Sequence, residues 1–535
     1  MPPLTGRNLL LEEPIRLASI LESSLHHRAA VPSLTKVVGT VGGRSRSVEA
    51  LEALLRAGMT VARFDFSHGG ADYQQHTLDN LRAAMRRTKK LCAVMLDTVG
   101  AELMIANPGG APIALAAGHD ITLSPSCCTA SASCLPISFH GLAQAVRAGD
   151  EIFVGQYLFT GTETTSVWLQ VQEARGADVV CSIRNSTTLA GPFFTAHAAR
   201  VRIDIPTLTA MDRQHIATWG RRNNVDIISL SFTRHPDDVA QARALLRSLG
   251  DLEQTQIYAK IENMQGLQHV EGILEAADGI ILSRGNLGID LPPEKVFGVQ
   301  KRALALCNLA GKPAVITRVV DSMVDAPRPT RAEATDVANA VLDGADALLL
   351  GAETLRGLYP AATVETVGHI CAQAERVFNH AAYFKSTLKA VPDPMSHLET
   401  ICASAVRTAE KVRAAALVVF TSSGHTARLV CKYKPSMPVL ALMVPRVSTN
   451  QLSWHLVGPF QAHQCLAVRG LFPILADVMS RGGSAGSSTW APEEALLQLA
   501  LERGQAMGVV RARDRVIVVQ KLRDAFAVRI VEAFT

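Results

Sequence analysis

Short apolar runs alternate with segments of helical periodicity along much of this chain. The runs are rich in valine, isoleucine, leucine and alanine, as expected of parallel strands that are buried on both faces. Those that precede residue 351 cover residues 35–40, 60–64, 92–96, 226–230, 256–260, 279–282, 313–317 and 345–350. Eight repeats of a strand and a helix predict a closed (β/α)8 TIM barrel of the α/β class.

Two parts of the chain depart from this pattern. Between residues 102 and 205 threonine, valine and glycine recur, apolar and polar positions alternate, and helical periodicity is weak, so we expect an inserted all-β domain. After residue 382, new helical and apolar segments predict a C-terminal open α/β domain. The expected organisation is an N-terminal arm (1–32), a barrel in two parts (33–101 and 206–382), the β domain (102–205) and the C-terminal domain (383–535).

Polar side chains follow each predicted barrel strand. They are Arg46; Asp65, Ser67 and His68; Asp97 and Thr98; Ser231 and Arg234; Lys260 and Glu262; Gly285 and Asn286; Thr330 and Arg331; and Glu353. Any one of them could be a helix cap, a turn residue or a structural ion pair. Their coincidence at eight strand ends, where barrel enzymes carry their active sites, favours a shared site. Cations, carboxylates and glycine backbone together suit an anionic substrate, and a phosphate held with a divalent metal in particular.

Composition narrows the choice of function. The chain has 535 residues, 48% of them hydrophobic, and a net charge of +5 without a basic stripe, so we expect several domains and no nucleic-acid partner. No apolar run approaches the length of about 18 residues that a membrane span needs. Glu12, Glu13 and Glu22 argue against a signal or transit peptide, which favours the cytosol. Cys127, Cys128 and Cys134 are grouped in a Ser/Ala-rich stretch and are either a redox site or a reduced surface loop.

Several motifs together resemble the pyruvate kinase family, and its plant cytosolic form in particular. They are TKVVGTVG, ARFDFSHG, LDTVGAE, KIEN, SRGNLGIDLPPEKVF, PRPTRAEATDVANAVLDGADALLLGAET and TSSGHTARL. The resemblance implies a barrel with a β lid, a C-terminal regulatory domain and usually a homotetramer in the cytosol. It also implies transfer of a phosphoryl group from phosphoenolpyruvate to ADP, giving pyruvate and ATP, with Mg²⁺ (or Mn²⁺) and K⁺ as cofactors.

The resemblance also implies residue roles. Arg46 and Lys260 would bind the substrate phosphate, Lys260 would also neutralise the enolate oxygen, and the backbone at Gly285 and Asn286 would take the substrate carboxylate. Thr330 would complete that contact and help deliver a proton. The remaining assignments are Glu262 and Asn286 for Mg²⁺; Asp65, Ser67, Asp97 and Thr98 for K⁺; and Asp65 and His68 for the nucleotide. A Glu at position 102 accompanies K⁺ dependence in the family.

The loop before a predicted C-terminal helix has two interpretations. Its residues Thr421, Ser422, Ser423, Gly424 and Thr426 could hold a sugar-phosphate effector, or the loop could be an ordinary capped helix start.

Some positions depart from the usual family pattern. Asn286 replaces a metal-binding Asp, Asp65 replaces an Asn, Met104 replaces an Arg, and Gly351 replaces a Ser. These changes motivate an alternative, a catalytically impaired regulatory or ligand-binding relative. A metal-dependent lyase or aldolase on the same barrel is a third class, which the inserted and C-terminal domains disfavour.

Overall fold

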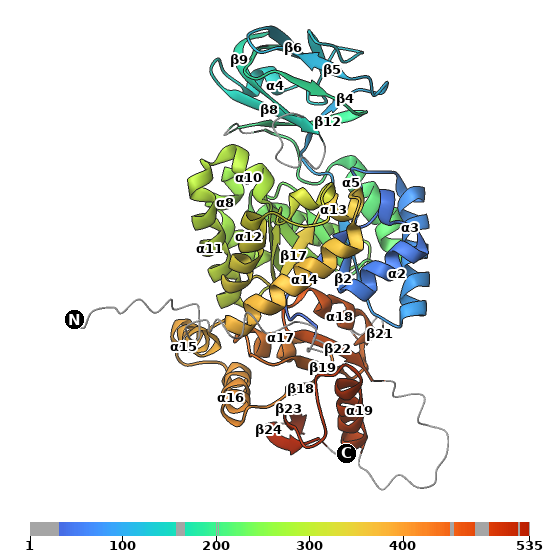
Figure 1. Ribbon diagram of the computed structural model, residues 1–535, viewed down its shortest axis with the longest axis vertical. Coiled ribbons are helices and arrows are strands. Elements are labelled where there is room, and N and C mark those ends of the chain that lie inside the picture. The colour runs from blue at the N-terminus through green and yellow to red at the C-terminus, as the bar shows by residue number, and fades with distance from the viewer. Residues whose placement is uncertain are drawn as a thin grey trace, which may run out of the picture.

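The computed structural model describes residues 32–156, 166–199, 201, 203–449, 454–476, 492–522 and 525–533. Of the expected N-terminal arm, residues 1–31 lie outside this description. Figure 1 shows a β domain at one end of the molecule, an α/β barrel in the middle and a second α/β domain at the other end.

The barrel closes as predicted, through eight parallel strands in the order β1-β17-β16-β15-β14-β13-β3-β2. The strands are β1 (Lys36–Thr40), β2 (Met59–Asp65), β3 (Ala93–Asp97), β13 (Ile227–Leu230), β14 (Gln256–Ile261), β15 (Gly279–Leu282), β16 (Ala314–Thr317) and β17 (Ala347–Leu350). Each expected strand is confirmed to within two residues at either end. The apolar runs therefore located the barrel because both faces of every strand are buried.

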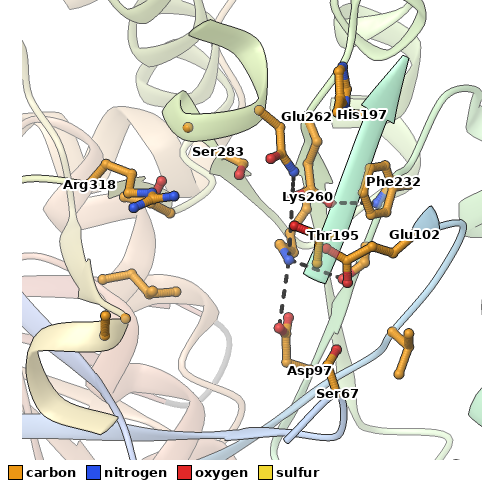
Figure 2. Close-up of a pocket in the computed structure, with 18 of the residues that line it drawn as sticks. Ser67, Asp97, Glu102, Thr195, His197, Phe232, Lys260, Glu262, Ser283 and Arg318 are labelled. Atoms are coloured by element: carbon orange, nitrogen blue, oxygen red, sulfur yellow. Dashed lines mark hydrogen bonds and ion pairs between the residues drawn. The ribbon is translucent and has the colours of Figure 1, made fainter. Parts of the chain in front are cut away.

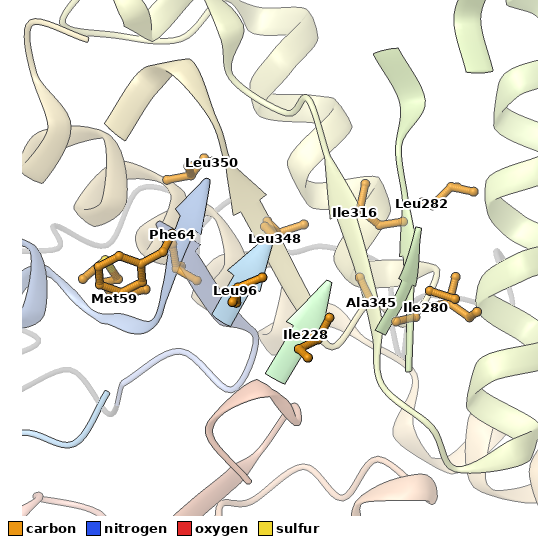
Figure 3. Packing of buried hydrophobic residues seen from close by; sticks show 14 of the residues in the cluster. Met59, Phe64, Leu96, Ile228, Ile280, Leu282, Ile316, Ala345, Leu348 and Leu350 are labelled. Carbon is orange, nitrogen blue, oxygen red and sulfur yellow. The ribbon is translucent and has the colours of Figure 1, made fainter. Parts of the chain in front are cut away.

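Successive residues of a barrel strand point to opposite sides. In β15, Ile281 packs inside the barrel with Val38, Val61 and Tyr258, whereas Ile280 and Leu282 belong to the outer core between strands and helices. Figure 3 shows this outer layer, where Phe64, Leu96, Ile228 and Leu348 lie close together. A continuous layer of this kind holds the strand ends in fixed positions.

Helices surround the barrel. The longer ones are α2 (Val48–Ala57), α3 (Ala71–Thr88), α7 (Pro236–Ser248), α11 (Pro293–Ala310), α12 (Arg331–Leu342) and α14 (Pro360–Val377). Shorter helices are α5 (Ala210–His215), α6 (Arg221–Asn223), α8 (Met264–Gln268), α9 (Val270–Ala276), α10 (Arg284–Asp290) and α13 (Ala352–Leu355). Two of the short ones, α10 and α13, directly follow β15 and β17 and help to form the mouth of the barrel.

The inserted β domain, called the lid below, has its own sheet in the order β4-β12-β8-β9-β10-β6-β7, and a separate pair β11-β5. Its strands are β4 (Leu103–Ala106), β5 (Ile113–Leu115), β6 (Asp120–Ser124), β7 (Cys134–Pro136), β8 (Glu151–Gln156), β9 (Ser166–Arg175), β10 (Asp178–Ile183), β11 (Thr187–Leu189) and β12 (Phe193–Ala198); α4 spans Leu142–Ala145. A separate core that includes Ile152, Val167 and Phe194 makes the lid a distinct packing unit.

The C-terminal domain is an open sheet in the order β22-β19-β18-β23-β24. Its strands are β18 (Ala416–Thr421), β19 (Val439–Met443), β22 (Leu471–Leu475), β23 (Arg515–Leu522) and β24 (Ala525–Glu532), with a hairpin of β20 (Arg446–Thr449) and β21 (Trp454–Val457). Its helices are α15 (His380–Ala390), α16 (His397–Val412), α17 (His425–Lys432), α18 (Pro459–Gln464) and α19 (Pro492–Ala506). Leu466 and Ala467, which follow α18, pack into the same cluster as the barrel interior.

All ten cysteines are free thiols. Seven are buried, whereas Cys128 is exposed and Cys127 and Cys134 are half-buried, so this group lies near the surface of the lid. Among the described helices, none is both long and apolar enough to cross a membrane.

Candidate active site

A cavity lies at the carboxyl ends of the barrel strands, where the lid meets the barrel (Figure 2). Predicted site residues that line it are Ser67, Asp97, Thr98, Glu102, Ser231, Lys260, Glu262, Gly285, Asn286 and Glu353. The barrel brings them together because they follow, or lie at the ends of, six strands of one closed sheet.

Lys260 occupies the centre of the cavity. Its Nζ lies 3.0 Å from Ser231 Oγ, 3.4 Å from Glu262 Oε1 and 3.6 Å from Asp97 Oδ2. Burial opposes the charge, but the neighbouring carboxylates of Asp97 and Glu262 outweigh it and raise the pKa of Lys260. The cavity therefore holds a permanent positive charge that is fixed by its neighbours.

Glu262 and Asn286 form the candidate divalent-metal site. Glu262 is 2% exposed, and its Oε2 accepts a hydrogen bond of 2.8 Å from the backbone N–H of Phe232. Asn286 Nδ2 donates to Glu262 Oε1 over 3.2 Å. One carboxylate and one amide oxygen are hard donors that fit Mg²⁺, with the rest of its ligands left to substrate and water. Within the described residues no group of three His, Cys, Asp or Glu side chains has metal-ligand geometry.

A second group of oxygens surrounds Asp65 and Asp97. Asp65 is ion-paired with Arg63 and accepts a 3.0 Å hydrogen bond from Ser67 N. Asp97 Oδ1 is buried and has no hydrogen-bond partner, and burial raises the pKa of this carboxyl. Burial, and then the charge of Glu262, raises the pKa of Glu102 to about 8. In this part of the site the acidic side chains outnumber the cationic ones, and Asp97 Oδ1 has no hydrogen-bond partner. Such an oxygen suits a monovalent cation such as K⁺.

Family models match the chain over most of its length. The pyruvate kinase barrel domain matches residues 33–364, and the pyruvate kinase alpha/beta domain matches residues 399–526. The chain belongs to the pyruvate kinase family.

Individual relatives agree with this membership. Cytosolic pyruvate kinase 2 of Oryza sativa subsp. indica is 59% identical over 526 residues, covering 98% of this chain and 99% of that protein. The cytosolic pyruvate kinase isozyme of Solanum tuberosum is 39% identical over 519 residues, 96% of this chain and 99% of the relative. A crystal structure of Cryptosporidium parvum pyruvate kinase aligns with a TM-score of 0.82 at 30% identity, covering 94% of this chain and 98% of the other. The predicted family, and its resemblance to the plant cytosolic form, are confirmed.

Three residues that the motif comparison did not single out also line the cavity, namely Arg63, Thr317 and Arg318. Arg63 is 4% exposed and its Nη1 lies 3.7 Å from Asp97 Oδ2. Thr317 is the last residue of β16, and Arg318 follows it with a positive φ of 60°. An arginine inside an apolar run is a detectable signal, because a buried guanidinium needs carboxylates or a ligand beside it.

Thr330 does not lie in this cavity. It is exposed and caps α12, where its Oγ1 donates to Glu333 Oε2 over 2.8 Å and accepts from Glu333 N over 3.2 Å. This is a capping box, which the spacing Thr-x-x-Glu in TRAE could have revealed. Thr317, the last residue of β16, lines the cavity, whereas Thr330 does not.

Arg46 and His68 are not among the residues that line the cavity, although His68 directly follows Ser67, which does. The Arg46 guanidinium stacks 3.9 Å from the centre of the Tyr73 ring, and its Nη2 lies 3.1 Å from His76 Nδ1. His68 lies 6.1 Å from Tyr73, ring centre to ring centre. The first predicted strand end therefore contributes no residue to the cavity lining, whose arginines are Arg63 of β2 and Arg318 after β16.

The loop Thr421–Thr426 lies where predicted, between the end of β18 and the start of α17. Gly424 N donates to Thr421 Oγ1 over 3.0 Å, and His425 N donates to Ser423 Oγ over 3.4 Å. These bonds lie within the turn before α17, whose N-cap residue Gly424 makes no side-chain cap hydrogen bond. An effector role for the loop stays a prediction.

Proposed function

We propose that this protein transfers the phosphoryl group of phosphoenolpyruvate to ADP, giving pyruvate and ATP. The observation that carries this proposal is the placement of Lys260 between Asp97 and Glu262, beside the start of α10. A fixed cation next to oxygen ligands and backbone N–H groups is the arrangement that phosphoryl transfer requires, because the reaction needs positioned positive charge rather than a covalent intermediate.

Each group has a definite part in the proposed reaction. Lys260 and Arg63 neutralise the phosphoryl group as it leaves the enolate oxygen, and their buried ion pairs hold them in place before substrate binds. The backbone N–H groups of Gly285 and Asn286, in the first turn of α10, bind the substrate carboxylate.

Two cations complete the proposed site. When bound between Glu262 and Asn286, Mg²⁺ or Mn²⁺ supplies Lewis-acid stabilisation of the transferring group. When bound among Asp65, Ser67, Asp97 and Thr98, K⁺ offsets the negative charge that these carboxylates and the substrate phosphate share. The orphaned Asp97 Oδ1 supports the second assignment.

The nucleotide would bind beside Arg46, His68 and Tyr73. Stacked aromatic and guanidinium surfaces there offer a flat contact for a base or ribose and a charge for a phosphate. Asp65 is buried against Arg63, so its part is electrostatic rather than a direct nucleotide contact. By analogy with relatives that are named cytosolic, we place the protein in the cytosol. The homotetramer that the family resemblance implies stays a prediction.

A coupled assay of pyruvate formation tests the proposal. Purified full-length protein is expected to turn over with saturating phosphoenolpyruvate, ADP, Mg²⁺ and K⁺. Absence of turnover under these conditions would favour the impaired relative, which is motivated by the amide of Asn286 facing Glu262. Binding of phosphoenolpyruvate without turnover, measured by calorimetry, would distinguish that relative from a misfolded preparation.

A further inference from the structure

We propose that Cys127 and Cys134, in the lid, form a redox site whose two thiols are converted reversibly into a disulfide. The sequence alone allowed two interpretations of Cys127, Cys128 and Cys134, called the loop cysteines below: a redox site or a reduced surface loop. None of the three lines the cavity that serves the proposed reaction. The redox site is therefore a second site, separate from the catalytic one.

Accessibility distinguishes the loop cysteines from the other thiols of the chain. Cys128 is exposed, and Cys127 and Cys134 are half-buried, whereas the seven remaining cysteines are buried. Burial raises the pKa of each of those seven thiols, which keeps them protonated as well as out of contact with solvent. Buried, protonated thiols react poorly. An oxidant in solution therefore meets the loop cysteines first.

The loop that carries these cysteines has a fixed shape. It connects β6 to β7, which are neighbouring parallel strands, so it has to return along the length of the strands. At its start Cys127 N donates to Ser124 O over 3.4 Å, and at its end Ser131 N donates to Cys134 O over 2.8 Å. Ala130, between these two turns, packs against the lid core. The positions of the two thiols are therefore set by the turns and by the core.

The thiols of Cys127 and Cys134 are neighbours within this loop. Cys127 Sγ donates to Thr129 O over 3.1 Å, so its sulfur is left to act as an acceptor. Burial, and then a hydrogen bond with the Cys127 side chain, raise the pKa of Cys134 to about 12. The two sulfur atoms are thus in contact in the reduced protein, which is the first requirement for a bridge between them.

The oxidation balances with a hydroperoxide, such as hydrogen peroxide, as the co-reactant. The Cys127 thiolate attacks one peroxide oxygen and breaks the O–O bond, which gives a sulfenic acid and one water. The Cys134 sulfur then attacks the sulfenic sulfur. The S–S bond forms as the S–O bond breaks, and the departing hydroxide takes the Cys134 proton as a second water. Two electrons pass from the sulfur pair to the peroxide, and a dithiol reverses the reaction by exchange.

The order of the two steps follows from the surroundings of Cys134. Besides burial and Cys127, the negative charge of Asp178 acts to raise the pKa of Cys134, so this thiol stays protonated and is a poor first nucleophile. Cys127 is therefore the thiol that reacts with the peroxide, and Cys134 is the one that closes the bridge. In a reducing cytosol such a bridge is transient, as in redox-sensing proteins.

Peptide mapping of the full-length protein tests the redox site without any need for turnover, so its result is independent of the proposed function. The protein is reduced, freed of reductant, treated with hydrogen peroxide and alkylated, and mass spectrometry identifies each cysteine as free, bridged or oxidised. We expect a bridge between Cys127 and Cys134 that forms at least about tenfold faster than any buried cysteine is oxidised. Dithiothreitol is expected to remove it.

Serine variants assign the two steps. Cys134→Ser is expected to form no bridge and to stop at the sulfenic acid of Cys127, which dimedone traps. Cys127→Ser is also expected to form no bridge. The matched control is Cys128→Ser, which removes the neighbouring exposed thiol and should form the bridge at a rate within about twofold of the wild type.

Two results with the folded wild type would overturn the inference. One is a bridge made through Cys128, within one chain or between two chains. The other is oxidation of Cys127 to a sulfinic acid without any bridge to Cys134. If a serine variant does not fold, the wild-type map decides alone: a Cys127–Cys134 bridge supports the inference, and its absence overturns it.

Discussion

At the scale of single residues, Lys260 is the group whose removal should affect the reaction most. Replacement of Lys260 by Met removes the central cation while preserving much of the side-chain volume. Loss of a preorganised charge at the transferring group is expected to lower kcat by at least about 100-fold. The measurement is steady-state turnover with the coupled assay. Lys295→Met, at an exposed position of α11, is the control and should leave turnover unchanged; comparable activity of both variants would contradict the role of Lys260.

Asn286 sets the strength of the proposed divalent-metal site. Its amide donates to Glu262 over 3.2 Å, whereas an Asp at this position would place two carboxylates side by side. Asn286→Asp is therefore expected to destabilise the metal-free protein and to bind Mg²⁺ or Mn²⁺ more tightly, since hard cations prefer carboxylate oxygen. Titration of Mn²⁺ by electron paramagnetic resonance and the shift of melting temperature on adding Mg²⁺ measure this. Weaker metal binding by the variant would show that position 286 is not a ligand.

Glu102 should determine the dependence on K⁺. It lines the cavity with Glu262 and Asp97, and the charge of Asp65 also acts on it. A monovalent cation would offset the negative charge that these groups carry when they are ionised. Replacement of K⁺ by tetramethylammonium at constant ionic strength is expected to reduce wild-type turnover sharply. Glu102→Lys is expected to retain a larger share of its activity, because the lysine supplies a charge in place. Full wild-type activity without K⁺ would refute this reading of the pocket.

At the scale of elements, a side-chain pair links the lid to the barrel at the cavity. His197, in β12 of the lid, lies with Nε2 2.8 Å from Oδ1 of Asp290, the last residue of α10. Since α10 also carries Gly285 and Asn286, this contact links the position of the lid to the substrate-binding turn.

We expect His197→Ala to weaken closure of the lid over the cavity. Loss of a hydrogen bond of this kind costs about 1 kcal/mol, so KM for phosphoenolpyruvate should rise roughly fivefold, with a smaller effect on kcat and on the melting temperature. His119→Ala, at an exposed position of the lid, is the matched control. A KM equal to that of the wild type would show that the contact does not contribute to closure.

At the scale of the whole molecule, a buried lysine lies where the barrel meets the C-terminal domain. Lys36, at the start of β1, is 2% exposed, and its Nζ lies 3.7 Å from the centre of the Phe472 ring in β22. Burial is the largest effect on this group and lowers the pKa of Lys36 from 10.5 to about 8. Below pH 8 both folded and unfolded chains are charged at this position, so the full cost of burying the cation is present.

Between pH 8 and 10.5 the unfolded chain binds more protons at Lys36 than the folded protein, so this lysine makes the free energy of unfolding rise with pH. Lys36→Met is expected to raise the melting temperature at pH 7 and to reduce that rise. Thermal unfolding across this range is the measurement. Lys411→Met, at an exposed position, should have the pH dependence of the wild type; a lower melting temperature for Lys36→Met would contradict the assignment.

The sequence by itself determined the elements and the family. Strands buried on both faces must be continuously apolar, so the barrel was readable from eight short runs, and Lys260, Glu262 and Asn286 were readable because they stand at strand ends. The tertiary structure decided which threonine and which arginine face the cavity. Thr330 follows a strand but caps a helix, and Arg46 follows a strand but stacks on Tyr73, whereas Thr317 and Arg63 lie within their strands and face inward.

The physical reason for this division is the range of the interactions. Burial of a strand and capping of a helix depend on neighbours in sequence, which the chain displays directly. The convergence of Arg63, Lys260, Arg318 and Glu353 on one cavity depends on the closure of the barrel. Closure brings residues of β2 and β14 together with residues that follow β16 and β17, across almost 300 positions. The ionisation of Glu353 depends on burial and on Asp321, and neither is visible until the chain has folded.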